Sequence, residues 1–167
     1  MSFAIDTAGL DDAGAIAALQ TRVADALTNR HGLGHWSAAV SPQSVARAIQ
    51  SSIVLVGRER GSIVGTLRLV TKKPWAIDPA YFTMVDRALY LTDMAVAPAA
   101  QRTGIGRVLL EHAVEAARQW PADCIRLDAY DAPAGAGGFY ARCGFREVGR
   151  VLYRKTPLIY FEKLLPL

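Results

Sequence analysis

A glycine-containing turn ahead of an apolar, helix-like run is the part of the sequence best suited to bind a ligand. It reads QRTGIGR over residues 101–107 and continues as VLLEHA. The first amides of a helix have no intrahelical partner, and its N-terminus carries a partial positive charge, so an anion can accept several N–H bonds there. Gly104 and Gly106 lack a Cβ and let the backbone approach oxygen atoms closely. Arg102 and Arg107 add charge that suits a diphosphate, although a plain helix start with glycine for flexibility and arginine for solubility explains the same residues.

Two common phosphate-binding motifs do not fit this turn. A P-loop needs a lysine followed by serine or threonine after its second glycine, and no such pair follows here. A dinucleotide fingerprint needs a third glycine where the chain has Leu109, and an acidic residue at the end of a following strand. The nature of the bound phosphate compound must therefore come from the surrounding elements.

Composition sets the class of protein. The 167 residues are 51% hydrophobic and 20% charged, which fits one globular domain over residues 1–167 with a sizeable core. The sequence shows neither a secretory leader nor an apolar run of about 18 residues, so we expect a cytoplasmic protein without membrane contact. Two cysteines outside any CxxC pair, with no histidine cluster near them, predict no metal site. The net charge of +4 suits a polyanionic cofactor, while the scattered basic residues make nucleic-acid binding an unlikely main role.

Hydrophobic periodicity and breaker residues predict the elements that must position this turn. Helices are expected over residues 12–29, from Pro42 behind the N-cap Ser41, over 104–120 and over 133–143. Strands are expected over residues 52–56, 62–70, 87–96, 124–130, 145–153 and 158–165, with an irregular connection over 71–86. A strand, a helix and a strand in succession imply a right-handed parallel crossover. The chain should therefore form one mixed, mostly antiparallel α/β sheet with helices on both faces.

Two motifs at a fixed separation resemble the GNAT superfamily of acyl-CoA-dependent N-acetyltransferases. The first is a strand ending in Val96 and Pro98, followed by Gln101, Gly104 and Gly106 in the pattern [RQ]xxGx[GA]. The second is a tyrosine before a Gly-Phe pair, here Tyr140 ahead of residues 144–145. The resemblance covers nearly the whole chain, and it implies the GNAT fold with a splayed, parallel central strand pair.

The resemblance also implies how acetyl-CoA, as co-substrate, would be held. In the family, the strand before the turn splays from its parallel neighbour, and the pantetheine arm bonds to its main chain. Carried over, that strand segment is Met94, Ala95 and Val96. The amides that would cradle the pyrophosphate run from Arg102 to Arg107, namely Arg102, Thr103, Gly104, Ile105, Gly106 and Arg107. Gln101, the first residue of the motif, is also expected to take part in cofactor binding.

Acyl transfer to an amine needs a group that takes a proton from the amine and a group that gives one to the departing thiolate. Tyr140 matches the tyrosine that the family uses as general acid, and its ordinary pKa of about 10 keeps it protonated at neutral pH. Family members often carry an acidic residue where this chain has Thr92, so the neighbouring Asp93 becomes the candidate base. Strand alternation would point Asp93 to the face opposite Thr92 unless a bulge intervenes. His31, His35, Asp128 and Asp131 stay open as alternatives for the base.

The acceptor is less well defined by the sequence. The resemblance implies a primary amine of a small molecule or a peptide, with His35, Trp36 and Asp128 as candidate contacts. Pro133 stands where many members have an asparagine, and together with Thr92 it leaves open a non-catalytic module that binds acyl-CoA as a sensor. Acetylation of a macromolecule such as aminoacyl-tRNA is a further alternative. An exposed last strand would favour a homodimer.

Overall fold

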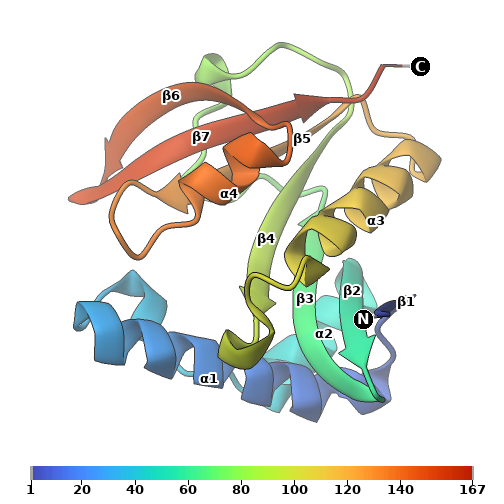
Figure 1. The fold of residues 1–167 in the computed structure, drawn as a ribbon. Helices are drawn as coiled ribbons and strands as arrows, with labels where there is room; N and C mark the ends of the chain where they lie inside the picture. The colour runs from blue at the N-terminus through green and yellow to red at the C-terminus, as the bar shows by residue number, and fades with distance from the viewer. Residues whose placement is uncertain (1, 167) are drawn as a thin grey trace. The chain divides into compact units, whose positions relative to one another are not determined.

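A computed structural model describes residues 2–166. The chain forms two compact units. Unit 1 comprises Met1–Leu69 and Thr92–Ala113, and unit 2 comprises Val70–Leu91 and Val114–Leu167. The strand order is β1-β2-β3-β4-β5-β7-β6, mostly antiparallel with one parallel pair, which confirms the predicted fold class (Figure 1). Strand β4 (Ala88–Val96) and helix α3 (Ile105–Gln119) each contribute residues to both units. The expectation of one domain over 1–167 stays a prediction.

Unit 1 is built from a short antiparallel array and the helices beside it. Besides the second half of β4 and the start of α3, its elements are β1 (Ala4–Thr7), η1 (Leu10–Asp12), α1 (Ala13–His31), η2 (His35–Ser37), α2 (Pro42–Ser51), β2 (Ile53–Glu59), β3 (Ser62–Val70) and η4 (Pro98–Ala100). Helix α2 begins as predicted, because the Ser41 side chain accepts a hydrogen bond from the Ser44 amide at 3.2 Å. Strand β1 was not predicted, since four mostly exposed residues carry no alternating apolar pattern.

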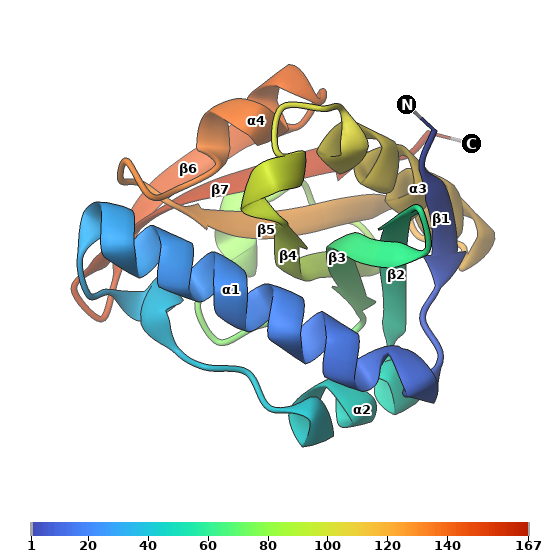
Figure 2. The same cartoon turned by 60° about the horizontal axis from the view of Figure 1, so that its bottom comes forward.

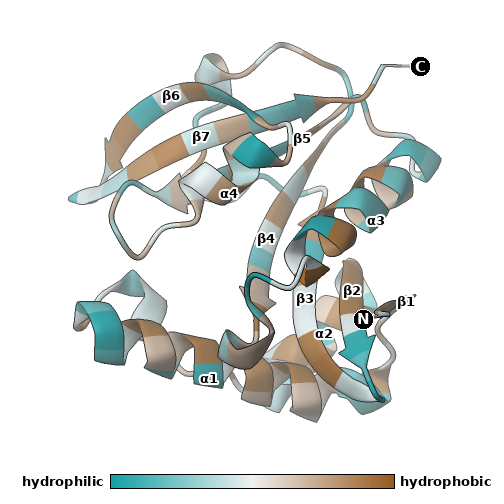
Figure 3. Cartoon of the chain, in the orientation of Figure 1, coloured by the Kyte–Doolittle hydropathy of each residue, from teal (hydrophilic) through white to brown (hydrophobic). Residues whose placement is uncertain are grey.

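Helices cover both faces of the unit 1 strands. Helices α1 and α2 contact each other extensively and lie on one side of β2 and β3 (Figure 2). On the other side, Ile105 and Leu109 of α3 pack so closely over Gly57 and Gly65 that an added Cβ would lie 2.8 and 2.7 Å from their side chains. Ile105 and Leu109 belong to the apolar stripe of α3, which alternates with polar residues along the helix (Figure 3).

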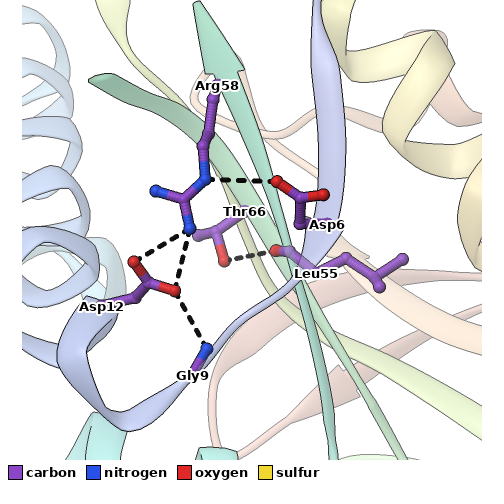
Figure 4. A network of polar contacts seen from close by, with 6 residues as sticks. All are labelled: Asp6, Gly9, Asp12, Leu55, Arg58 and Thr66. Atoms are coloured by element: carbon purple, nitrogen blue, oxygen red, sulfur yellow. Dashed lines mark hydrogen bonds and ion pairs between the residues drawn. The ribbon is translucent and has the colours of Figure 1, made fainter. Parts of the chain in front are cut away.

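An ion pair ties the start of α1 to strand β2 within unit 1. The Asp12 carboxylate accepts a hydrogen bond from the Gly9 amide at 2.9 Å and two from Arg58 Nη2 at 3.0 Å (Figure 4). Arg58 Nε also donates to Asp6 at 3.3 Å. The Gly9 amide, followed by Arg58, holds the pKa of Asp12 below its usual range. Asp12 is the N-cap residue of α1, but its side chain makes no cap hydrogen bond to that helix.

Unit 2 joins the first half of β4 to the C-terminal strands. Its other elements are η3 (Pro79–Tyr81), β5 (Cys124–Tyr130), α4 (Gly137–Arg142), β6 (Arg146–Tyr153) and β7 (Thr156–Leu164). The parallel pairing of β4 with β5 runs over the first three residues of each strand, from Ala88 with Cys124 to Tyr90 with Arg126. Strand β7 lies between β5 and β6. The last strand is therefore not at the sheet edge, which corrects the reason given for a homodimer.

The irregular segment between β3 and β4 is fastened to β7 by buried polar side chains. Glu162, which is 1% exposed, accepts hydrogen bonds from the Thr83 amide at 2.9 Å and the Thr83 hydroxyl at 3.1 Å. The Tyr160 hydroxyl accepts from the Asp78 amide and donates to the Ala76 carbonyl. Arg126 Nη2 donates to the Thr83 carbonyl at 2.9 Å. These bonds give a segment without regular structure a fixed path along one face of β5 and β7.

Candidate active site

The turn before α3 has the backbone geometry of an anion-binding loop. Arg102 and Gly104 both have positive φ, of 63° and 96°. The Gln101 side chain donates to the Val96 carbonyl at 3.1 Å, which braces the turn against the end of β4. The Val108 amide bonds back to the Gly104 carbonyl at 3.1 Å, so by helix geometry the amides of residues 105–106 precede the first intrahelical bond. The positive φ explains the need for glycine at position 104.

Asp93 interrupts the regular course of β4. Its φ is +55°, in the left-handed region that few non-glycine residues occupy within a strand. The Thr92 hydroxyl lies 3.4 Å from Asp93 Oδ2, so simple alternation does not hold at this pair. The Asp93 carbonyl accepts a hydrogen bond from Gln20 of α1 at 3.3 Å, and its carboxylate lies 3.7 Å from Arg68 Nη1. Unit 1 thus presents an exposed carboxylate from a distorted strand position next to the expected pantetheine-binding residues.

A cavity of about 260 Å³ opens beside Asp93 within unit 1. Helices α1 and α2 and the segment between them form its apolar wall, which includes Ile16, Val40 and Val45. Strands β3 and β4 supply its charged groups, Arg68 and Asp93. The cavity therefore combines an apolar wall with one cation and one anion.

Tyr140 lies on α4 in unit 2 and is buried, with 7% of its surface exposed. Its ring contacts those of Phe139, Phe145 and Phe161, with centroids 5.5, 5.9 and 6.0 Å away. Burial raises the pKa of the Tyr140 hydroxyl well above its usual range, and the charge of Asp128 raises it further. The hydroxyl therefore keeps its proton at neutral pH, as a general acid must.

Asp128 lies on β5, where it pairs with Tyr160 of β7. Burial raises the pKa of this carboxyl group. The charge of Asp128 in turn raises the pKa of Tyr130 and Tyr160, after the larger effect of burial on each. A half-buried carboxylate near several hydroxyl groups is a common feature of functional sites.

A family model described as an acetyltransferase (GNAT) domain matches residues 50–147, more than half of the chain. This chain belongs to the GNAT family of N-acetyltransferases. The matched range includes the turn before α3 and the Tyr140 segment, the two motifs on which the resemblance depended. Comparison with curated proteins gives no match.

Solved structures share the GNAT fold across almost the whole chain. An N-acetyltransferase from Staphylococcus aureus Mu50 has a TM-score of 0.74 at 18% identity, covering 99% of this chain and 100% of that one. The yncA protein from Salmonella typhimurium, solved with its cofactor acetyl-CoA, has a TM-score of 0.73 at 19% identity, covering 99% and 95%. A ribosomal-protein-alanine N-acetyltransferase from Brucella melitensis has a TM-score of 0.74 at 22% identity, covering 97% and 99%. At these identities the likeness shows the fold.

His35 and Trp36, the loop residues predicted to contact the acceptor, do not line the cavity of unit 1. His35 and Trp36 form η2, and Trp36 Nε1 donates to the Gly32 carbonyl at 3.0 Å. The ring of Trp36 also meets that of His31 edge-on, with centroids 6.5 Å apart. The cavity wall begins a few residues later, at Ala39 and Val40. The role of His35 and Trp36 in acceptor binding stays a prediction.

Arg68 is the cavity residue that sequence reasoning missed. It lies in β3, where it is partly buried between the buried residues Leu67 and Leu69. The signal was present: Thr66 and Arg68 occupy alternate positions in an otherwise apolar strand, so both point to the same face. A cation at such a position needs a partner, and the distorted position of Asp93 on β4 provides it.

A second cavity, of about 290 Å³, lies within unit 2. Its lining includes four aromatic side chains, those of Trp75, Tyr81, Tyr153 and Tyr160. Trp75 is 83% exposed at the rim of this cavity.

Residues 2–166 contain no group of three potential metal ligands. None of their helices has the length and apolar character of a membrane span.

Proposed function

We propose that this GNAT enzyme transfers the acetyl group of acetyl-CoA to a primary amine of a small molecule or peptide. The observation that carries the proposal is the turn before α3, with its positive φ at Arg102 and Gly104 and its amides ahead of the first intrahelical bond. These amides suit the pyrophosphate of coenzyme A. The presence of acetyl-CoA in the Salmonella yncA structure supports the choice of co-substrate.

The proposal assigns the turn and the strand before it to the cofactor. Main-chain groups of Met94, Ala95 and Val96 would bond the pantetheine arm. The backbone amides from Arg102 to Arg107 would hold the pyrophosphate. Ile105 is 1% exposed and packs on Gly57, so its contribution is its amide alone.

Two residues are assigned to proton transfer. The amine must lose a proton before it attacks the thioester carbon, and the exposed Asp93 carboxylate takes that proton directly or through water. The C–N bond then forms, the C–S bond breaks, and Tyr140 donates its proton to the departing thiolate. The support for Tyr140 is its place in the tyrosine motif of the family, and its hydroxyl is protonated before the step.

A peptide amine is a reasonable acceptor class because the Brucella relative is a ribosomal-protein-alanine N-acetyltransferase. The main alternative is a module that binds acyl-CoA without turnover. Two departures from the family pattern favour it: Thr92 in place of a carboxylate, and Pro133 in place of asparagine. Both readings predict tight cofactor binding, so binding alone does not separate them.

Thiol release from acetyl-CoA, followed over a panel of small amines, amino acids and peptides, separates the acetyltransferase from the non-catalytic module. We expect release that depends on at least one amine, together with acetyl-CoA binding by calorimetry. Binding without release on any amine would establish the sensor. Absence of binding would contradict the turn assignment itself.

A further inference from the structure

The cavity of unit 1 has the chemistry of a site for one small molecule that carries two opposite charges. Its volume of about 260 Å³ is close to the lower bound of about 300 Å³ for small-molecule sites, which suits a compact ligand. Apolar side chains form one wall, namely Ile16, Val40, Val45, Ala48 and Val54. Arg68 and Asp93 stand on the strands beside this wall.

The guanidinium of Arg68 is oriented but not fully used. Its Nε donates to the Ser52 hydroxyl at 2.7 Å, which fixes the plane of the group. Its Nη1 lies 3.7 Å from Asp93 Oδ2, too far for a hydrogen bond. Among residues 2–166, the hydrogen bonds of this guanidinium end at Nε, so both Nη atoms can donate to a ligand. A planar, pre-oriented guanidinium is the group best suited to a carboxylate.

The carboxylate of Asp93 is equally available for an ammonium group. It is 54% exposed, and its contacts are the Thr92 hydroxyl at 3.4 Å and the distant Arg68. The left-handed backbone of Asp93 places this carboxylate among the residues that line the cavity. The bond from Gln20 to the Asp93 carbonyl supports that unusual backbone from the side of α1.

We infer that the acceptor is an aliphatic α-amino acid. Arg68 binds its carboxylate, Asp93 binds its ammonium group, and the apolar wall takes its side chain. The inference rests on the proposed acetyltransferase function. A simple alkyl amine would leave the Nη atoms of Arg68 without a hydrogen-bond acceptor, since Asp93 lies 3.7 Å away. A peptide N-terminus lacks a carboxylate on the carbon next to the amine.

The bound amino acid enters the reaction with its charges balanced. Its ammonium group gives one proton to Asp93, and the free amine attacks the thioester carbon. The new C–N bond forms, the C–S bond breaks, and Tyr140 gives its proton to the departing thiolate, so that coenzyme A leaves as the thiol. The second proton of the amide nitrogen restores the Tyr140 hydroxyl. The proton held by Asp93 passes to water, so the products are the N-acetyl amino acid, coenzyme A and one proton.

The test compares leucine with 3-methylbutylamine, which is leucine without its carboxylate. Thiol release is measured for the wild type, Arg68→Gln, and the control Arg47→Gln, which removes an exposed arginine on α2 outside the cavity lining. We expect a KM for leucine at least tenfold below that for the amine in the wild type. Arg68→Gln should raise the KM for leucine about tenfold and leave that for the amine unchanged. Arg47→Gln should change neither.

Two further measurements keep the outcomes separate. Ala48→Phe fills the cavity without removing a charge, and it should raise the KM for leucine even where Arg68→Gln fails to fold. Calorimetry with leucine alone measures the site without turnover. Equal use of leucine and 3-methylbutylamine overturns the inference while the proposed function stands. Arg68-dependent leucine binding without thiol release keeps the site and overturns the proposed function.

Discussion

Asp12 of unit 1 and Asp128 of unit 2 are surrounded in opposite ways. In unit 1, Asp12 meets the Gly9 amide and Arg58 at 2.9 and 3.0 Å, and its pKa is lowered. In unit 2, burial raises the pKa of Asp128 and of the neighbouring Tyr140. Donors that stabilise the charged form favour charge, whereas apolar surroundings favour the protonated form. The surroundings of Asp12 therefore favour a charged group, and those of Asp128 and Tyr140 favour a bound proton.

This difference predicts which kinetic constants each unit controls. Apart from the proposed base Asp93, changes in the charged groups and backbone donors of unit 1 should act on ligand affinity. Changes at the buried hydroxyl of unit 2 should act on the chemical step. A substitution that alters the wrong constant would contradict the division.

Tyr140→Phe tests the division with the largest expected effect. Loss of the general acid should lower kcat about 100-fold or more, because the thiolate then leaves without its proton donor. The affinity for acetyl-CoA should stay unchanged, as measured by calorimetry. Tyr130→Phe is the matched control, since Tyr130 is a half-buried tyrosine of β5 whose pKa is also raised by burial and by Asp128. An equal loss of kcat in both variants would show that Tyr140 has no special part in the reaction.

Gly104→Asp tests the binding role of unit 1. A side chain at φ +96° strains the turn, and a carboxylate repels the pyrophosphate, so we expect the Kd for acetyl-CoA to rise about 30-fold. Gly104→Ala separates the two causes, because nothing lies within 4 Å of an added Cβ there and only the strain remains. Calorimetry should order the variants as wild type, alanine, aspartate. Similar affinity in all three would exclude the turn as the pyrophosphate site.

The same comparison shows what the sequence could and could not predict. The strands, the cap at Ser41 and the turn before α3 depend on local periodicity and on glycine and proline, so they were predictable. Strand β1 is short and mostly exposed, and its existence depends on pairing with β2 about 50 residues later. Of the candidate site, the sequence predicted the parts that belong to motifs, which are the turn before α3 and Tyr140. The positive φ of Asp93 and its approach to Arg68 depend on tertiary packing, to which no sequence motif corresponds.

Asp128→Asn sharpens the contrast in pH dependence. The folded pKa of Asp128 is raised, so its contribution to stability is complete below the unfolded value near 3.8 and is lost as pH rises through the folded value. Asparagine does not titrate, so the variant should gain free energy of unfolding relative to the wild type as pH rises from 4 to 7. Denaturant unfolding across that range measures the difference. A constant difference would show that Asp128 titrates as it does in the unfolded chain.

Asp12→Asn should give the opposite slope with the smallest effect. The folded pKa of Asp12 is lowered, so its contribution is present above the unfolded value near 3.8 and is lost as pH falls through the folded value. At pH 7 we expect a loss of about 1 kcal/mol, because asparagine can still accept the Gly9 hydrogen bond but lacks the charge that faces Arg58. This loss of free energy of unfolding should shrink toward pH 3. The control is Asp11→Asn, at an exposed neighbouring residue, which should change stability by less than about 0.5 kcal/mol at every pH. If Asp12→Asn and Asp128→Asn shift stability with the same sign of slope, the two units do not differ in the way their acidic groups are held.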